Sequence, residues 1–328
     1  MNTPIAITCL AFMFSPLASF AQSVSGVTGT TRIAQWKDDK KSPFMLMFDD
    51  GCPSQKANVV PELKKRGMAA TFYNFPAAGH YQGNKAFWET VVPAIPGLAY
   101  GNHTVNHKGF ATVQNAEQEI TEANALIMRL FPGKSPRLIS YADPGGVKNA
   151  ISGAELDVIL AKNNLIRRPD FGGHGGGIAF HTAGDVLAAV DRAIGKGTPE
   201  YIICHGVGGD WIVFPLAEFT QLLDGLEARS DSLWIADTIS VHKYETERAK
   251  AQVQFRNDSP KSIRISLTAD VNPALYDQPL TLVTMVPADW KKCRVVQGSS
   301  QATVTVENGK VTYDAMPGGV LITLTPEG

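Results

Sequence analysis

Between residues 44 and 248, short apolar runs alternate with segments whose apolar residues recur at helical spacing. The runs of strand type are Phe44–Phe48, Ala69–Asn74, Gly97–Gly101, Arg137–Tyr141, Asn164–Arg168, Tyr201–Cys204 and Leu233–Ala236. The helical segments are Ser54–Arg66, Ala116–Leu130, Gly153–Lys162, Gly184–Ile194, Leu216–Ala228 and Ser240–Ala249. Strands that alternate with helices predict parallel βα units, and hence an α/β fold that is either a (β/α) barrel or a doubly wound sheet. In both folds the chemistry lies at the carboxyl ends of the strands.

The pattern changes after about residue 251. Short β segments follow one another there, separated by turns of Asn, Asp, Gly and Pro, without an intervening helical segment. These segments are Val253–Phe255, Ser262–Leu267, Leu280–Val286, Ala302–Val306 and Val320–Leu324. We therefore expect residues 22–249 to form the βα domain and residues 250–328 to form a small β-sandwich domain. Because the second domain contains no histidine, any histidine chemistry belongs to the first.

The first 21 residues carry no charged side chain, are apolar from Ile5 to Phe20, and end in Ser19-Phe20-Ala21. These features are typical of an export signal with a cleavage site of small residues. Ser15-Pro16 interrupts the apolar run, which is short for a membrane span. We expect residues 1–21 to be a signal peptide and the mature protein to be secreted or periplasmic, without stable membrane insertion.

Composition excludes several classes of function. Lys and Arg total 30 against 31 Asp and Glu, so no basic excess indicates a nucleic-acid partner. Removal of the leader leaves Cys52, Cys204 and Cys293, an odd number without close spacing. This argues against a disulfide scaffold and a CxxC zinc ribbon. The sequence gives no indication of the oligomeric state.

The predicted strand Phe44–Phe48 ends abruptly in Asp49-Asp50-Gly51. Neighbouring residues of a strand point to opposite sides, so the two carboxylates need not share one environment. One carboxylate can ligate a metal ion while the other transfers protons. The structural alternative is a solvated turn or a helix N-cap, because a helical segment follows. Histidines further along the chain favour the functional interpretation.

His103 and His107 are four residues apart, a spacing that places both rings on one face of a helix or lets them converge in a turn. Two imidazoles and one carboxylate leave open coordination positions, as in a catalytic metal site. His205 directly follows the predicted strand Tyr201–Cys204 and so belongs to the same edge of the fold. His80 has no companion and is assigned to surface or core by default.

Three segments resemble motifs of the polysaccharide deacetylases, the NodB-homology group or carbohydrate esterase family 4. They are Phe48-Asp-Asp-Gly51, Asn102-His-Thr-Val-Asn-His107 and Ile202-Ile-Cys-His205, in the order and at the spacing of that family. The resemblance covers roughly residues 32–249. It implies a distorted (β/α) barrel and a divalent metal ion, usually zinc, that removes acetyl groups from carbohydrate. Cobalt, nickel or manganese would fit the same ligands.

Carried over by position, the resemblance makes Asp50, His103 and His107 the metal ligands. Asp49 is then the general base that deprotonates water, and His205 the general acid that protonates the leaving group. The acid is needed because an amine leaves poorly unless it is protonated, and histidine is suited to this task near neutral pH.

The third motif of the family, Arg-x-Pro-Tyr-Gly, falls on Ala142-Asp-Pro-Gly-Gly146, where the arginine and the tyrosine are missing. The arginine normally orients the catalytic aspartate, and Arg168 is a candidate to replace it in space. Gly145 retains a backbone N–H that can donate to a tetrahedral oxyanion. The fourth motif corresponds to Asp170, which is expected to orient His205.

Other residues have a structural explanation beside a functional one. The segment Gly172–Gly177 lacks the lysine of a phosphate loop and is interpreted as a flexible rim loop, from which His174 can touch substrate. Cys52 is more simply a small buried residue than a soft metal ligand. Trp88 and Trp211 are either core residues or walls that stack on a sugar ring.

The sequence therefore predicts an exported, metal-dependent deacetylase that hydrolyses N-acetyl groups of a poly- or oligosaccharide. One alternative is an O-acetyl esterase of the xylan type that uses the same site. A second is a non-catalytic carbohydrate-binding protein on an inactivated barrel, which the incomplete third motif suggests. The polymer and the bond type stay open at this point.

Overall fold

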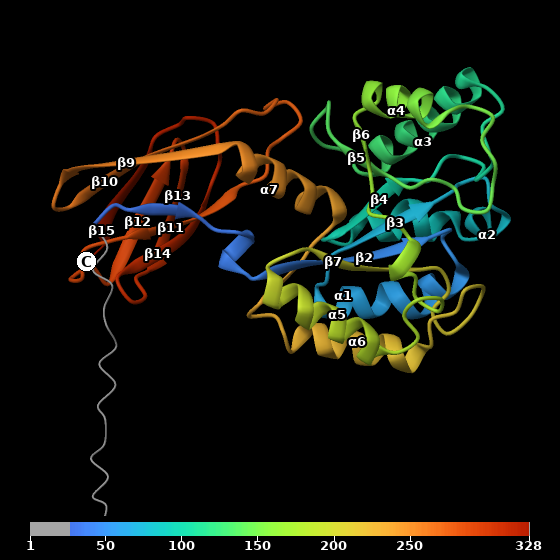
Figure 1. The fold of residues 1–328 in the computed structure, drawn as a ribbon, viewed down its shortest axis with the longest axis horizontal. Coiled ribbons are helices and arrows are strands. Elements are labelled where there is room, and N and C mark those ends of the chain that lie inside the picture. The colour runs from blue at the N-terminus through green and yellow to red at the C-terminus, as the bar shows by residue number, and fades with distance from the viewer. Residues whose placement is uncertain (1–26, 328) are drawn as a thin grey trace, which may run out of the picture.

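A computed structural model describes residues 27–327 of the 328-residue chain, so the predicted signal peptide lies outside the described residues. The described chain forms two parts, a parallel sheet covered by helices and an antiparallel β domain (Figure 1). None of the helices between residues 27 and 327 has the length and apolar character needed to traverse a bilayer.

The first part contains the alternation of strands and helices that the sequence predicts. Its strands are β2 (Ser42–Asp49), β3 (Ala70–Asn74), β4 (Leu98–Asn102), β5 (Ile139–Tyr141), β6 (Leu165–Arg167), β7 (Glu200–Cys204) and β8 (Leu233–Ile235). Its helices are α1 (Val60–Arg66), α2 (Gly79–Gln82), α3 (Val113–Leu130), α4 (Gly153–Lys162), α5 (Ala183–Lys196), α6 (Leu216–Glu227) and α7 (Thr238–Lys250). Most boundaries agree with the predicted ones within a few residues.

The strands pair in the order β6-β5-β4-β3-β2-β7, all parallel, and β8 pairs with the beginning of β2. The sheet curls into a half-barrel with helices on its outside (Figure 1). Within the described residues β6 and β7 do not pair, and a single bridge between Gly175 and Ile203 lies on the free side of β7. The fold is thus the predicted mixed α/β class with a distorted, incomplete barrel, followed by an all-β part.

Strand β2 shows why the site begins at Asp49. All eight residues of the strand are buried, as expected of a parallel strand that is covered on both faces. Asp50 has φ of 67° and Gly51 has φ of 65°, so the chain turns out of the sheet immediately after Asp49. Glycine adopts this left-handed conformation without cost, and aspartate tolerates it better than most residues. The turn separates the environments of the two carboxylates.

Two features of the helical layer were not predicted. The predicted helix Ser54–Arg66 begins with a π-helical turn at Gln55–Val59 before α1 continues it. Short helical turns also fill the segment between β3 and β4, namely α2, the π turn Phe87–Val91 and the 3-10 turn Val92–Ala94. These turns are too short to produce a helical periodicity that the sequence would reveal.

The β domain consists of two antiparallel sheets. Its strands are β1 (Thr31–Ile33), β9 (Ala251–Ser259), β10 (Ser262–Ala269), β11 (Leu280–Met285), β12 (Lys292–Gln297), β13 (Ser300–Thr305), β14 (Lys310–Ala315) and β15 (Ile322–Glu327). One sheet has the order β1-β11-β14 and the other the order β13-β12-β15-β10-β9. Ile265, Leu282 and Val295 from both sheets belong to one apolar core, which is the arrangement of a sandwich.

Three strands of this domain were not predicted. β12 and β14 alternate exposed and buried residues. Each strand therefore has only a few apolar side chains, too few to be recognised as an apolar run in the sequence. β1 lies in the segment that we assigned to the first domain, residues 22–249, but it pairs antiparallel with β11. The chain therefore contributes a strand to the β domain before it enters the parallel sheet.

Helix α7 lies between the two parts (Figure 1). Tyr244 on this helix donates a hydrogen bond to the carbonyl of Ala34, and the Glu247 carboxylate accepts one from the backbone N–H of Gln278 at 2.9 Å. Glu247 is fully buried, and its second oxygen has no partner among the described residues. Burial raises the pKa of Glu247 to about 7.

Candidate active site

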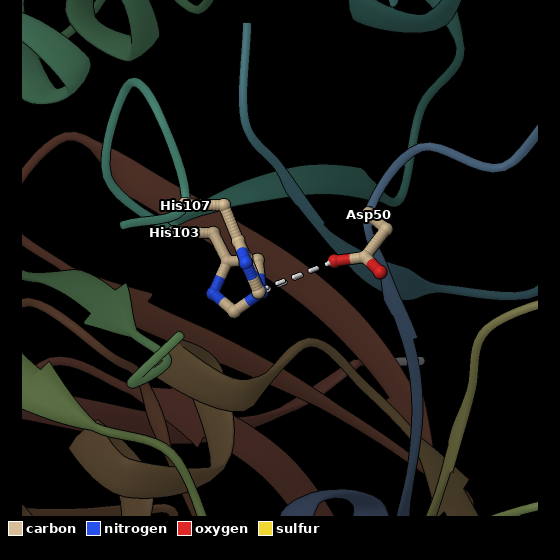
Figure 2. A group of neighbouring side chains, drawn as sticks. All are labelled: Asp50, His103 and His107. Atoms are coloured by element: carbon tan, nitrogen blue, oxygen red, sulfur yellow. Dashed lines mark ion pairs between the residues drawn. The ribbon is translucent and has the colours of Figure 1, made fainter. Parts of the chain in front are cut away.

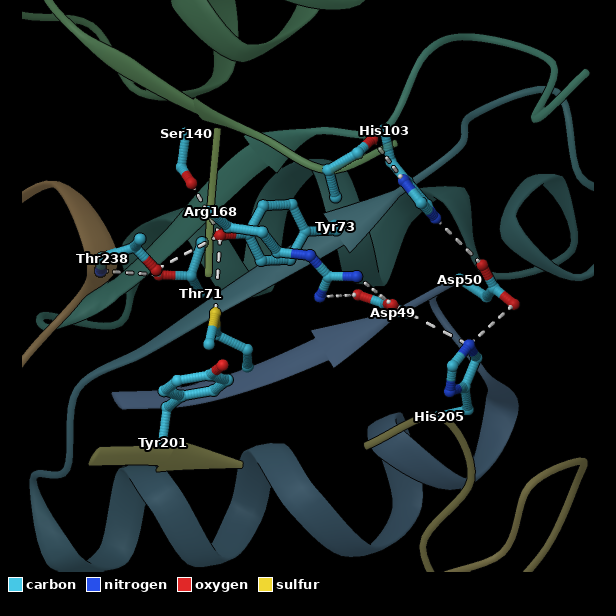
Figure 3. A network of polar contacts seen from close by, with 12 residues as sticks. Asp49, Asp50, Thr71, Tyr73, His103, Ser140, Arg168, Tyr201, His205 and Thr238 are labelled. Carbon is cyan, nitrogen blue, oxygen red and sulfur yellow. Dashed lines mark hydrogen bonds and ion pairs between the residues drawn. The ribbon is translucent and has the colours of Figure 1, made fainter. Parts of the chain in front are cut away.

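The candidate site lies at the carboxyl edge of the parallel sheet. Asp49 ends β2, Asp50 follows it, His103 follows β4, His205 follows β7 and Arg168 follows β6. Figure 3 shows these five side chains converging from strands that are distant in sequence. The parallel arrangement accounts for this, because the carboxyl ends of parallel strands meet at one edge.

Asp50, His103 and His107 form a cluster that could hold a metal ion, with their ligand atoms within 4.8 Å of one another (Figure 2). Oδ1 of Asp50 lies 3.4 Å from Nε2 of His103 and 3.6 Å from Nε2 of His107. This oxygen is buried and has no hydrogen-bond partner among the described residues. A buried carboxylate oxygen without a donor is costly unless a cation satisfies it, so the donor set fits a divalent ion.

The two histidines are brought together by a turn rather than by a helix. Thr104 and His107 have φ of 61° and 54°, and the Thr104 hydroxyl accepts a hydrogen bond from the His107 backbone N–H. His103 is fixed separately, because its Nδ1 bonds to the carbonyl of Ala142 at 3.0 Å. That bond directs Nε2 of His103 toward Asp50, as second contacts of metal-binding histidines commonly do.

The ionisation of the cluster suits cation binding. Burial alone would raise the pKa of Asp50, but the neighbouring imidazoles of His103, His205 and His107 lower it to about 2. Burial and the neighbouring His103 lower the pKa of His107 below its usual value. The carboxylate is thus ionised at neutral pH, and the His107 imidazole is in the neutral form that ligates metals.

Arg168 makes a bidentate ion pair with Asp49. Its two terminal nitrogens donate to Oδ1 and Oδ2 of Asp49, each at 2.8 Å, and both side chains are buried. The charge of Asp49 raises the pKa of Arg168 above its usual value although burial opposes this. Arg168, the candidate from the sequence, therefore makes the contact with Asp49 that was expected of the arginine missing from the third motif.

A buried support holds Arg168 in position. Its guanidinium lies over the ring of Tyr73, 4.8 Å from the centroid, and the Tyr73 hydroxyl bonds with Ser140 and Thr238 (Figure 3). The ring passes so close to Gly101 that a Cβ there would lie 2.1 Å from it. Only glycine at position 101 therefore lets Tyr73 occupy the place beneath Arg168.

His205 faces both carboxylates. Its Nε2 lies 3.8 Å from Oδ2 of Asp49 and 3.8 Å from Oδ2 of Asp50. Its Nδ1 is buried and has no hydrogen-bond partner among the described residues, although we expected Asp170 there. Asp170 is exposed instead, and its backbone carbonyl accepts a hydrogen bond from Tyr201. The expected orienting contact is therefore absent, and the ring of Phe171 packs edge-on against His205 instead.

Gly145 lies in the exposed loop after β5, three residues beyond the carbonyl that holds His103. A Cβ at Gly145 would meet nothing within 4 Å. No hydrogen bond of its N–H is found among the described residues. The N–H is therefore available to a ligand, as the expected role as oxyanion donor requires.

Two further residues contact Asp50, although the sequence predicted such a contact for neither of them. The indole of Trp211 donates to Oδ2 of Asp50 at 2.9 Å, and Nε2 of His80 lies 2.7 Å from the Asp50 backbone carbonyl. His80 is thus not an isolated histidine. His80 comes from helix α2, which was not predicted from the sequence. Trp211 had been considered from the sequence, but as a residue that could stack on a sugar ring.

Two other candidates do not belong to the cluster. His174 stacks on Tyr201 and pairs with Glu200 at 3.0 Å, at the beginning of β7 rather than at its carboxyl end. The Cys52 thiol is buried and donates to the carbonyl of Asp49. Burial raises the pKa of this thiol, and Cys52 is not part of the cluster of Asp50, His103 and His107.

Comparisons with known proteins agree with the motifs. Residues 37–156 match the family model of polysaccharide deacetylases. This segment contains Asp49, Asp50, His103 and His107, and over it the chain is similar to the polysaccharide deacetylase family. No curated protein matches the sequence.

Solved structures of carbohydrate esterase family 4 are similar at low identity. A family 4 carbohydrate esterase from Streptomyces lividans, in complex with acetate, is 20% identical, with a TM-score of 0.41 over 59% of this chain and 91% of that one. A family 4 pseudoenzyme from Bacillus anthracis is 16% identical, with a TM-score of 0.43 over 61% of this chain. This chain spans 64% of the length of that pseudoenzyme, which is less than two thirds.

Proposed function

We propose that this chain is an exported, metal-dependent deacetylase that hydrolyses N-acetyl groups of a poly- or oligosaccharide. The supporting observation is the juxtaposition of the cluster Asp50, His103 and His107 with a proton-transfer pair, Asp49 and His205, whose Oδ2 and Nε2 are 3.8 Å apart. The match of residues 37–156 to the polysaccharide deacetylase model supports carbohydrate as the substrate class.

The donor set favours zinc as the ion. Asp50, His103 and His107 would hold it with two imidazole nitrogens and one carboxylate oxygen, which leaves positions open for substrate and water. Cobalt, nickel and manganese accept the same donors. When bound, such an ion supplies Lewis acidity, which polarises a carbonyl oxygen and makes a nearby water more acidic.

The remaining steps belong to residues of the chain. The Asp49 carboxylate accepts a proton from the attacking water, whose oxygen forms the new C–O bond to the acetyl carbon. Arg168 occupies one position on each Asp49 oxygen, and each oxygen keeps a further lone pair for this proton. Nε2 of His205 delivers a proton to the leaving nitrogen as the C–N bond breaks, which yields acetate and a free amine. The Gly145 N–H donates to the oxyanion that forms between these events.

The incomplete third motif had suggested a non-catalytic binding protein. The bidentate pair between Arg168 and Asp49 favours the enzyme instead, because the base is oriented although the arginine comes from a different strand end. An O-acetyl esterase would use the same residues. Only the substrate that is hydrolysed, ester or amide, distinguishes the two activities.

The experiment measures acetate release by the mature chain from acetylated chito-oligosaccharides and from acetylated xylan. We expect release from the chito-oligosaccharides, loss with a chelator and recovery with zinc. Release from xylan alone would establish the ester alternative. Binding of sugar without turnover in zinc, cobalt, nickel or manganese would overturn the enzyme proposal.

Two matched variants accompany this assay. Asp49→Asn removes the proposed base and should lower the rate by about 10²- to 10⁴-fold. Asp191→Asn breaks a similar bidentate pair, with Arg229 on the surface, and should leave the rate unchanged. Equal rates for wild type and Asp49→Asn would refute the assignment of the base.

Export is part of the proposal and is tested separately. We expect the protein in the periplasm or the medium, with Gln22 as its first residue after removal of residues 1–21. Cell fractionation and N-terminal sequencing measure this. A cytoplasmic protein that retains residues 1–21 would contradict it.

A further inference from the structure

The loop between β7 and α6 places Trp211 against the carboxylate of Asp50. Its indole N–H donates to Oδ2 at 2.9 Å, while 38% of the residue stays exposed. Asp50 itself is only 7% exposed. A tryptophan on the rim of the site is therefore bonded to a buried oxygen of a candidate metal ligand.

The backbone on both sides of Trp211 is strained. Asp210 and Ile212 have φ of 66° and 49°, and a β-branched residue such as isoleucine rarely adopts a left-handed conformation. Gly206 allows the loop to close, because a Cβ there would lie 1.9 Å from the carbonyl oxygen of Gly209. The Asp210 carboxylate accepts a hydrogen bond from the backbone N–H of Ser54 at 2.6 Å, which ties the loop to the segment after β2. Strain of this kind persists where the surrounding structure holds it, and it concentrates at functional sites.

His80 adds a second contact to the same residue. Its Nε2 lies 2.7 Å from the Asp50 backbone carbonyl, and its ring meets the Trp211 ring edge-on at 5.3 Å between centroids. Asp50 is thus held at its main chain by His80 and at its carboxylate by Trp211.

The two oxygens of Asp50 consequently have different roles. Oδ2 receives the indole N–H, whereas Oδ1 has no donor and faces His103 and His107. The torsion that rotates an aspartate carboxylate has a broad and nearly two-fold energy profile, so without a hydrogen bond the two oxygens could exchange.

We propose that Trp211 is a positioning residue that fixes the Asp50 carboxylate with Oδ1 toward the two imidazoles, and that it thereby strengthens metal binding. This inference rests on the proposed metal-dependent function. Residues that orient metal ligands typically contribute about 10- to 100-fold in metal affinity. The exposed indole face does not carry this role, because the contact with Asp50 is made by the N–H alone.

The test compares Trp211→Phe, which keeps an aromatic ring but removes the N–H, with Trp234→Phe, the same change at a tryptophan that packs on Tyr244. Zinc affinity of the metal-stripped full chain is measured by competition with a chromophoric chelator. We expect Trp211→Phe to weaken zinc by about 10- to 100-fold and Trp234→Phe to leave it unchanged. The visible spectrum of the cobalt-loaded protein, which reports ligand geometry, should change only for Trp211→Phe.

Three outcomes decide between explanations. Wild-type zinc affinity and an unchanged cobalt spectrum in Trp211→Phe would overturn the inference. So would a raised KM at saturating zinc with unchanged metal affinity, because Trp211 would then be only a wall for substrate. A wild-type protein that binds no metal would instead refute the proposed function.

A measurement on the wild-type protein avoids any dependence on folding of the variant. Zinc should shift one indole N–H resonance among the five tryptophans, since Trp211 alone of them donates to a residue of the cluster in the described structure. If zinc binds and no indole resonance moves, the inference is wrong.

Discussion

Arg168 and Asp49 are 119 positions apart in the chain, yet both oxygens of the carboxylate receive a hydrogen bond of 2.8 Å from the guanidinium. Ala142, which occupies the position of the family's arginine, is buried and uses its backbone carbonyl to hold His103. The orienting charge on the proposed base therefore comes from the end of β6 rather than from the end of β5. Although the third motif is incomplete, Asp49 thus has an arginine partner.

The first prediction concerns this pair. Arg168→Lys keeps the charge but loses the planar fork, so we expect kcat to fall by about 10- to 100-fold with little change in KM. Arg168→Met leaves Asp49 buried without a partner and should lower the free energy of unfolding by about 3–5 kcal/mol. Arg229→Lys, which alters the surface pair with Asp191, is the control. Equal effects of Arg168→Lys and Arg229→Lys on kcat would contradict the prediction.

The second prediction concerns the leaving group. His205→Ala should lower hydrolysis of an N-acetyl amide by about 10²- to 10⁴-fold, because the amine can no longer be protonated as it leaves. An aryl acetate releases a stable phenolate and should lose much less activity. His181→Ala changes an exposed histidine and serves as the control. The same loss on amide and aryl ester would exclude His205 as the acid.

A third prediction distinguishes loss of the Gly145 backbone N–H from the addition of a Cβ at the same position. Gly145→Ala places a Cβ in open space and keeps the N–H, so activity should stay near that of the wild type. Gly145→Pro removes the N–H and should reduce kcat by about 10²- to 10³-fold, the usual contribution of one oxyanion donor. Thermal melting checks that both variants fold. Similar kcat values for the two variants would show that the N–H has no such role.

The fourth prediction concerns stability against pH. Glu247 has a pKa of about 7 in the folded protein against a usual value of 4.5. Between these values the folded state binds a proton that the unfolded state has released, so the contribution of Glu247 to stability is most favourable below about pH 4.5 and is lost as pH rises to about 7. Glu247→Gln keeps an acceptor for the Gln278 N–H, removes the ionisation and should add on the order of 2 kcal/mol at pH 8.

The measurement for Glu247 is the free energy of unfolding by urea at several pH values. The exposed Glu245 on the same helix supplies the control variant, Glu245→Gln. Parallel pH curves for wild type and Glu247→Gln would show that the buried carboxylate does not titrate in this range.

Much of the fold could be predicted because its signals are local. The eight residues of β2 are all buried and nearly all apolar, and the longer helices carry an apolar face at regular spacing. β12 and β14 were missed because alternate residues face solvent, and α2 was missed because four residues do not make a period. The pairing of β1 with β11 in the β domain was not predictable. Two strands that pair antiparallel but are far apart in the sequence leave no pattern in the residues around either strand.

The same distinction applies to the site. Asp50, His103 and His107 were expected as ligands from the resemblance to the deacetylase motifs, and the structure brings them together because a strand end and a short turn place them at one edge. The expectation for Asp170 failed because its neighbour two positions earlier, Arg168, turns inward while Asp170 turns to solvent. On an irregular segment, side chains that are two positions apart can differ completely in burial. No pattern in the sequence determines which of them points inward.

By itself, the sequence determined the alternation of strands and helices, the pair of carboxylates that ends β2 and the spacing of the two histidines. Each of these depends on neighbouring residues and on the periods of helix and strand. Only the tertiary structure decided that Arg168 orients Asp49 and that Trp211 and His80 hold Asp50. These contacts join side chains from separate loops, and their geometry depends on how the whole sheet curls and on where each loop turns.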